Sequence, residues 1–308
     1  MLARMHLGAR WGGWLGNSAL SKLDLRKPAR AALVLVATLL IAQAAVAQSA
    51  PASARQLGDA LRMDETLSIM QREAVQTAAE IAPDLFGGAA PAPWAAAVTA
   101  LYDPATARAQ FDAALDTALA RADAEQVVQA QDYLTAPTGQ LILTLEITAR
   151  EALLSADVEA AAKDTWAQMQ ADPLPASAQR VDLIRQIVAA NDLIEVNVMA
   201  ALNGNLAFYK GLAEAGLMEG MTSDDMLAEV WASEAEVRSD IEDWLYPYLA
   251  LAYAPLSDQD LRSYIAFSNA PAGQMLNAAL FAAFDALGAV QSQGMGLAAG
   301  QLMTGQDI

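Results

Sequence analysis

The sequence predicts an all-α protein, a multi-helix bundle built from two homologous helical repeats. Alanine, leucine, glutamine, glutamate and methionine are abundant along the chain, and these residues favour helices. Apolar residues recur three or four positions apart, and no stretch alternates β-branched with polar residues as a half-buried strand does. A nine-residue phrase also occurs twice, as YLTAPTGQL from Tyr133 and as FSNAPAGQM from Phe267.

Residues 1–47 have the composition of a secretory signal peptide. Six basic residues and one acid precede the apolar run AALVLVATLLIA at residues 31–42, and the small residues Ala45 and Ala47 follow it. We expect cleavage after Ala47, export to the periplasm of a Gram-negative bacterium, and no membrane contact afterwards. The alternative is an uncleaved anchor, although the apolar run is shorter than the ~20 residues that span a bilayer.

The composition after cleavage excludes several classes of function. Residues 48–308 keep 12 basic and 35 acidic residues, a net charge of −23, which argues against binding to nucleic acid or to anionic membranes. The chain has no cysteine, and its only histidine, His6, lies in the signal segment. We therefore expect no thiol or imidazole nucleophile, no zinc or haem site, and no other cofactor.

The first repeat is expected to span residues 48–172. Phe111, Leu115 and Leu119 lie four positions apart and predict an amphipathic helix over residues 107–122. Asp123 follows, in the position of an N-cap for the short helix that leads to the first repeated phrase.

The second repeat is expected to span residues 173–300. The stretch ADPLPASA at residues 171–178 marks the boundary before it because prolines and small polar residues favour a loop. Helical spacing resumes over residues 181–202. A turn follows at 215–225, where Gly216 or Gly220 can end one helix and Thr222 or Ser223 can cap the next. The segment of residues 288–308 is rich in glycine, glutamine and methionine and is expected to fray, and residues 301–308 are expected to form a disordered tail.

Each repeated phrase follows a short capped helix and has the features of a helix-to-helix junction. The cap of the second short helix is Ser257, with Asp260 three residues later. Pro137 and Pro271 disfavour helical geometry at the preceding residue, and proline is tolerated in the first turn of a new helix. Thr135 and Asn269 are suitable N-caps for that new helix.

A glycine lies just inside each new helix, at Gly139 and Gly273. Glycine costs about 1 kcal/mol relative to alanine in a helix, so we infer that the missing side chain allows the two helices to approach closely.

The repeated junction resembles the family catalogued as domain of unknown function 2059. The resemblance covers residues 123–154 and 257–289, where Ala136 and Ala270 stand at positions at which that family often has serine. The residues that carry it are Tyr133, Pro137, Gly139, Gln140, Phe267, Pro271, Gly273 and Gln274. The resemblance implies a helical periplasmic protein and brings no activity with it.

The helices that follow the two junctions differ in polarity. The first carries Glu146 and Arg150, an acid and a base four residues apart, whereas Leu280 and Phe284 occupy these positions in the second. The second helix has almost no polar face, so it must be buried. Either it forms the centre of the fold, which we favour, or residues 275–290 dock on a partner or on a second subunit.

Catalysis in this chain would depend on carboxylates. Glu146 is the acid in the most apolar surroundings, and paired carboxylates could cleave envelope glycans, although an ion pair with Arg150 is the simpler explanation. The acidic stretches TSDDMLAE and SDIEDW lack the glycine and the spacing of a calcium loop.

The aromatic stretch WLYPYLALAY, residues 244–253, is the feature most typical of a recognition surface. Trp244, Tyr246 and Tyr248, together with Phe284, form a candidate binding surface for a peptide or glycan, although their spacing also fits an ordinary core. We expect a non-catalytic binding or scaffold protein with a periplasmic or envelope protein as partner. The alternative is a carboxylate-dependent envelope glycan hydrolase, and the oligomeric state stays open.

Overall fold

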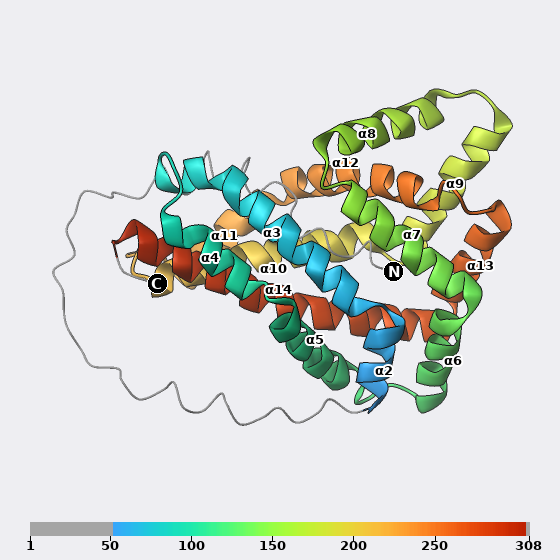
Figure 1. The fold of residues 1–308 in the computed structure, drawn as a ribbon, viewed down its shortest axis with the longest axis horizontal. Helices are drawn as coiled ribbons and strands as arrows, with labels where there is room; N and C mark the ends of the chain where they lie inside the picture. The colour runs from blue at the N-terminus through green and yellow to red at the C-terminus, as the bar shows by residue number, and fades with distance from the viewer. Residues whose placement is uncertain (1–51, 306–308) are drawn as a thin grey trace.

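The computed structural model describes residues 52–305, and every regular element within them is an α-helix (Figure 1). The predicted all-α class is therefore confirmed for this part of the chain, and the predicted signal peptide lies outside it. The helices are α2 (Ala52–Ala60), α3 (Met63–Phe86), α4 (Ala92–Leu101), α5 (Pro104–Leu119), α6 (Ala124–Thr135), α7 (Pro137–Ala152), α8 (Ala156–Ala171), α9 (Pro175–Ala190), α10 (Leu193–Glu214), α11 (Ser223–Ala232), α12 (Glu234–Tyr253), α13 (Asp258–Asn269) and α14 (Pro271–Met303).

The helices α9 to α14 follow the same order as α2 to α7. In each half, a first helix meets a long second helix at one residue in the left-handed region, Arg62 (φ 56°) or Asp192 (φ 52°). A short helix (α4 or α11) and a longer one (α5 or α12) follow. A short capped helix (α6 or α13) then leads to the proline junction. This order is what a duplication would produce, while common descent of the two halves stays a prediction. The helix α8 lies between the halves and has no counterpart.

The two halves interlock around the long helix α14. The helix α5 of the first half packs against α14 of the second, and α12 of the second packs against α7 of the first. Aromatic contacts join the halves: the rings of Phe111 and Phe284 lie 4.7 Å apart, and Tyr133 stacks on Phe267 at 3.7 Å. The predicted boundary at residue 172 is thus a short connection within one folded body.

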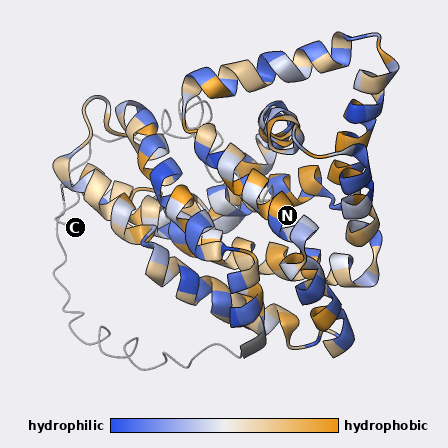
Figure 2. Ribbon diagram, turned by 45° about the vertical axis from the view of Figure 1, so that its right-hand side comes forward, coloured by the Kyte–Doolittle hydropathy of each residue, from blue (hydrophilic) through white to orange (hydrophobic). Residues whose placement is uncertain are grey.

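The buried apolar residues form two clusters. One lies among α2, the start of α3, α5, α6, α7, Trp166 of α8, α9, most of α12, α13 and the first half of α14. The other lies among the end of α3, α4, α10, α11, Ile241 of α12 and the last turns of α14. Figure 2 shows polar and apolar residues next to one another along the helices, as expected for amphipathic helices that cover a shared core.

The first junction is held by a glutamine and a glycine. Gln140 Nε2 donates hydrogen bonds to the carbonyl oxygens of Leu134 and Ala60, each at 2.8 Å, and so ties α7 to the ends of α6 and α2. A Cβ atom on Gly139 would lie 2.1 Å from the carbonyl oxygen of Tyr133, closer than any side chain can approach. The expected close approach is confirmed here.

The second junction repeats this geometry atom for atom. Gln274 Nε2 donates to the carbonyl oxygens of Ser268 at 2.6 Å and Ala190 at 3.0 Å. A Cβ atom on Gly273 would lie 2.0 Å from the carbonyl oxygen of Phe267. Both phrases therefore encode the same packing of three helix ends.

The expected N-caps of the junction helices are corrected by the structure. Ala136 and Ala270 are the N-cap residues, with extended backbones at ψ 154° and 155°. Proline disfavours helical geometry only at the residue directly before it, so the preceding helix continues through Thr135 and Asn269. Their side chains donate instead to carbonyl oxygens one turn earlier.

The other expected caps are confirmed. Asp123 accepts a hydrogen bond from the backbone N–H of Glu125 at the start of α6. Ser257 and Thr222 each form a reciprocal capping box with an aspartate three residues later, at the starts of α13 and α11.

The expected fraying of residues 288–308 is wrong as far as Met303, where α14 ends. The helix α14 continues to Met303, and its last turns are buried. A Cβ atom on Gly296 would lie 2.0 Å from the carbonyl oxygen of Phe208, and one on Gly211 would lie 2.1 Å from that of Gln293. The glycines weaken an isolated helix, but here they allow the backbones of α10 and α14 to touch.

The helix α14 is the one helix within residues 52–305 that is long and apolar enough to cross a membrane. Its contacts with α4, α5, α6, α10 and α13 place it inside the fold. We therefore interpret it as the core helix, in agreement with the favoured prediction for residues 275–290.

The Gly296 contact gives a stability prediction. Gly296→Ala should lower the free energy of unfolding by about 1–3 kcal/mol, because the new methyl group meets a backbone carbonyl that cannot move alone. Urea unfolding followed by circular dichroism measures this. Gly88→Ala is the matched control, since a Cβ atom there meets nothing within 4 Å. Equal losses in the two variants would contradict the close contact.

Candidate functional site

A cleft of about 380 Å³ opens between α3, the end of α7, α8 and α12. Most of its lining residues are polar. They are Glu73, Gln76, Thr77 and Glu80 from α3, Arg150, Leu153 and Leu154 at the end of α7, Ala156, Glu159 and Lys163 from α8, and Asp240, Asp243 and Trp244 from α12. The sequence pointed to Trp244 and Arg150 among these residues, but it gave no sign that the four helices meet here.

The cleft has an ordered charged floor. Arg150 is almost fully buried, and its Nε and Nη2 atoms donate to the two carboxylate oxygens of Glu73 at 2.7 and 2.6 Å. Burial alone would lower the pKa of the guanidinium, but the charge and hydrogen bonds of Glu73 outweigh it and raise that pKa. Arg150 therefore remains charged and fixed in place by a carboxylate from α3.

The walls of the cleft carry negative charge that no basic side chain balances. Lys163 pairs with Glu159 on its own helix at 2.6 Å, as Arg150 pairs with Glu73. Within residues 52–305, the remaining lining acids form no ion pair; they are Glu80, Asp240 and Asp243. A concave site with such walls focuses a negative potential that attracts cations.

Glu146 lies behind this floor and is completely buried. The hydroxyl of Tyr253 donates to Glu146 Oε1 at 2.8 Å, and the hydroxyl of Tyr248 donates to the Glu146 carbonyl oxygen at 3.2 Å. Burial, and then the charge of Glu146, raise the pKa of both tyrosine hydroxyls well above the ordinary value. Both hydroxyls are therefore protonated donors at neutral pH, and the group acts as a structural network in the core.

The structure divides the predicted binding surface. Trp244 lines the cleft, and Tyr246 stacks on Trp166 of α8 with their rings 5.2 Å apart. Tyr248 and Phe284 are buried in the core, so they are removed from the candidate surface. Tyr248 follows Trp244 by four residues, the spacing of an ordinary apolar helix face, which is the alternative that the sequence left open.

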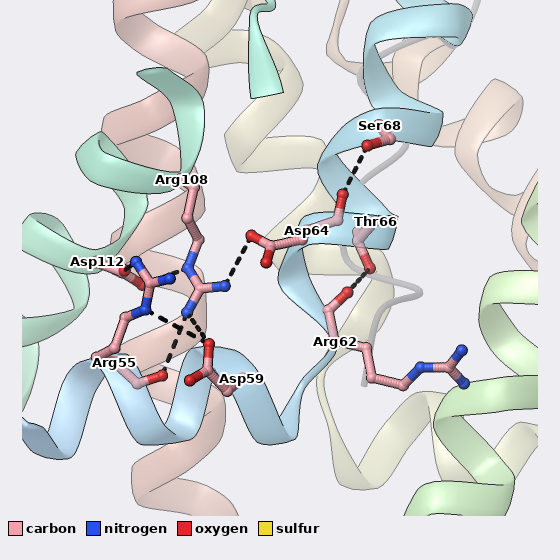
Figure 3. Close-up of polar contacts among 8 residues, drawn as sticks. All are labelled: Arg55, Asp59, Arg62, Asp64, Thr66, Ser68, Arg108 and Asp112. Carbon is pink, nitrogen blue, oxygen red and sulfur yellow. Dashed lines mark hydrogen bonds and ion pairs between the residues drawn. The ribbon is translucent and has the colours of Figure 1, made fainter. Parts of the chain in front are cut away.

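A second charged cluster joins the helices α2, α3 and α5 (Figure 3). Arg108 of α5 is 4% exposed and donates to Asp112 at 2.8 Å, Asp59 at 2.6 Å and Asp64 at 2.9 Å. It also donates to the carbonyl oxygen of Arg55 at 3.2 Å. These acceptors come from α2, α3 and α5, and they occupy all three guanidinium nitrogens. The cluster is therefore a structural tie rather than an open site.

The second half contains a related but more exposed tie. Arg238, near the start of α12, donates to both carboxylate oxygens of Glu195 at 2.5 and 2.8 Å, and to Glu234 at 2.8 Å. The hydrogen bond from Arg238 is the main reason why the pKa of Glu195 is lowered. Each half thus uses an arginine to tie its second helix to the helix that precedes the capped one. Arg108 ties α5 to α3, and Arg238 ties α12 to α10.

Comparison with protein-family models, with curated proteins and with solved structures finds no match to this chain. The resemblance carried by the two junction phrases therefore stays a prediction. Within residues 52–305, no group of His, Cys, Asp and Glu side chains has the arrangement needed to hold a metal ion. The cleft is the candidate site that the geometry offers.

The Arg108 cluster gives a prediction about buried charge. Arg108→Met should destabilise the fold by about 3–5 kcal/mol, because it leaves the buried carboxylate of Asp112 without its principal partner. The double variant Arg108→Met/Asp112→Leu should recover much of this loss in urea unfolding. Arg55→Met is the control, since Arg55 is 56% exposed, and should cost no more than about 1 kcal/mol. No recovery in the double variant would contradict this account.

The network around Glu146 gives a second prediction. Tyr253→Phe should cost about 1–3 kcal/mol, because a buried carboxylate oxygen loses a hydrogen-bond donor. Tyr246→Phe, which removes a hydroxyl from a half-buried ring at the surface of α12, should change stability by no more than about 0.5 kcal/mol. Thermal and urea unfolding of the two variants can be compared directly. Equal effects would show that the Glu146 contact adds nothing.

Proposed function

We propose that this protein is an exported binding protein whose cleft takes a small cationic ligand. The observation that carries the proposal is the unbalanced set of carboxylates on the cleft walls, Glu80, Asp240 and Asp243, beside the ring of Trp244. The volume of about 380 Å³ falls within the range of small-molecule sites. This assigns a ligand class to the binding protein that the sequence led us to expect.

The charge of the whole chain supports a cationic ligand. The segment after residue 47 carries a net charge of −23, and that field draws cations toward the protein before contact. Inside the cleft, Trp244, Leu153 and Leu154 provide apolar walls for the methylene groups that separate amines. A linear polyamine combines both features, because its positive charges alternate with short apolar segments.

The site is organised for binding in a fixed geometry. Arg150 and Glu73 form a bidentate ion pair at the floor of the cleft. Behind this pair, the hydrogen bonds from Tyr248 and Tyr253 to Glu146 hold α12 against α7. Preorganised walls reduce the conformational entropy that a bound ligand must overcome.

The alternative of glycan hydrolysis required Glu146 to face a second carboxylate in a cleft. Glu146 is instead enclosed in the core and accepts a hydrogen bond from Tyr253. A glycosidic oxygen has no access to it in this arrangement, so that version of the enzyme hypothesis has no structural support.

Export and periplasmic location form part of the same proposal. They depend on the basic region, the apolar run and the small residues before position 48, which have the order of a cleavable signal peptide. An envelope protein as an additional partner remains compatible with this location.

Calorimetry with spermidine tests the proposal. Spermidine should bind the chain of residues 48–308 at one site at low ionic strength, and the affinity should fall as NaCl is added. The triple variant Glu80→Gln/Asp240→Asn/Asp243→Asn should weaken binding about tenfold, since each lost charge pair contributes about 0.2–1 kcal/mol.

The matched control for this experiment removes acids elsewhere. Asp116→Asn/Glu219→Gln/Glu236→Gln changes three acids outside the cleft lining and should leave the affinity within about twofold once the change in net charge is screened by salt. Equal weakening in both variants would show attraction to the overall charge alone. No heat of binding to any of the three proteins would overturn the proposed function.

A further inference from the structure

One lysine side chain lies in the cleft. Residues 48–308 contain ten arginines and two lysines, Lys163 and Lys210. Lys163 belongs to the cleft lining, whereas Lys210 is exposed on α10, outside that lining. A lysine side chain consists of four methylene groups that end in a primary ammonium, which is also the structure of the aminobutyl arm of spermidine. The chain therefore places an alkylammonium group of its own in the cleft.

The partner of this ammonium is a carboxylate on the same cleft wall. Lys163 Nζ donates a hydrogen bond to Glu159 Oε1 at 2.6 Å, in an ion pair between residues four apart on α8. Ala156, Glu159 and Lys163 follow one another at intervals of three and four residues, so they share the face of α8 that lines the cleft. Glu159 thus accepts an ammonium group inside the cleft rather than on the outer surface of the helix.

This ion pair is open to exchange. The side chains of Glu159 and Lys163 are 37% and 38% exposed, so water competes for both charges and the pair contributes little to stability. Arg150 differs, because its side chain is 1% exposed and donates two hydrogen bonds to Glu73. A ligand can therefore replace the ammonium of Lys163 on Glu159 while the ion pair at the floor stays in place.

The other acids of the cleft favour a ligand with several charges over Lys163. Exchange at Glu159 replaces one ion pair with another of the same kind, so it adds little affinity by itself. Within residues 52–305, Glu80, Asp240 and Asp243 form no ion pair, and further ammonium groups of a ligand would form new pairs with them. Lys163 supplies one positive charge, whereas a polyamine supplies several.

We propose that Glu159 is a subsite for a primary ammonium group of the ligand, and that Lys163 occupies this subsite in the free protein. Lys163 is then a tethered competitor that keeps this wall neutral without ligand and disfavours ligands with a single charge. The inference rests on the proposed function for its ligand. It requires no movement of α8, because only side chains exchange.

Calorimetry of two lysine variants tests the competitor. At an ionic strength of about 0.1 M, Lys163→Met should tighten the binding of spermidine to the chain of residues 48–308 about three- to fivefold, because no side chain then competes for Glu159. Lys210→Met is the matched control. It removes the same charge from outside the cleft and should change the affinity by less than about 1.5-fold. Equal tightening in the two variants would overturn the role of Lys163.

Two double variants separate a contact with Glu159 from general attraction. Lys163→Met/Glu159→Gln removes the carboxylate of the subsite, so the affinity should return to that of the unaltered chain or fall below it. Lys163→Met/Asp164→Asn has the same net charge and should keep the gain, because Asp164 is exposed and lies outside the cleft lining. Equal affinities of these two double variants would contradict the subsite.

The outcomes distinguish the subsite from the proposed function. Spermidine binding to the unaltered chain that Lys163→Met does not tighten would overturn the subsite and leave the proposed function in place. Binding to Lys163→Met but not to the unaltered chain would contradict the proposed function and support Lys163 as the occupant. An absence of binding to every variant would overturn both.

Discussion

The fold depends on the direct backbone contact between α10 and α14. Gly211 and Gly296 let the two helices touch, and no side chain fits between them. This contact fixes α14 through the middle of the molecule, and α5 and α6 of the first half then pack against it. Because the partner of α5 belongs to the other half, neither half has a complete core of its own. The duplicated arrangement of helices therefore folds as one body. The connection between α8 and α9 is not needed to hold the two halves together.

The junctions were predictable because their physics is local. Proline, glycine and glutamine lie within four residues of one another in each phrase, and each acts on a helix end next to it in sequence. Caps such as Ser257 were equally clear, since a hydroxyl and an acid three residues later form a closed motif. The one local error concerned Thr135 and Asn269, where the sequence permits two adjacent N-cap positions and the fixed backbone before proline decides between them.

The features that sequence reasoning missed are those that need a distant partner. From the sequence alone, the glycines near the end of α14 indicate a weak helix, which is why a disordered tail was expected. Their role is visible only when α10 packs against them. Arg108 has one partner within a helical turn, Asp112, but its other acids are more than 40 residues away along the chain. The cleft has the same origin, because its walls come from four helices and no short segment contains more than a few of its acids.

The candidate site lies where the two halves cease to correspond. Arg150 and Phe284 occupy equivalent positions after their junctions, yet Phe284 packs on Phe111 inside the core and Arg150 forms the floor of the cleft. The divergence follows from the helix that comes next. In the second half, α14 continues straight and buries its apolar face against α10, so an apolar residue is required. In the first half, α7 ends at Ala152 and α8 turns back over the gap, which leaves a space with a polar lining. The asymmetry that interrupts the duplication is thus also what opens a site.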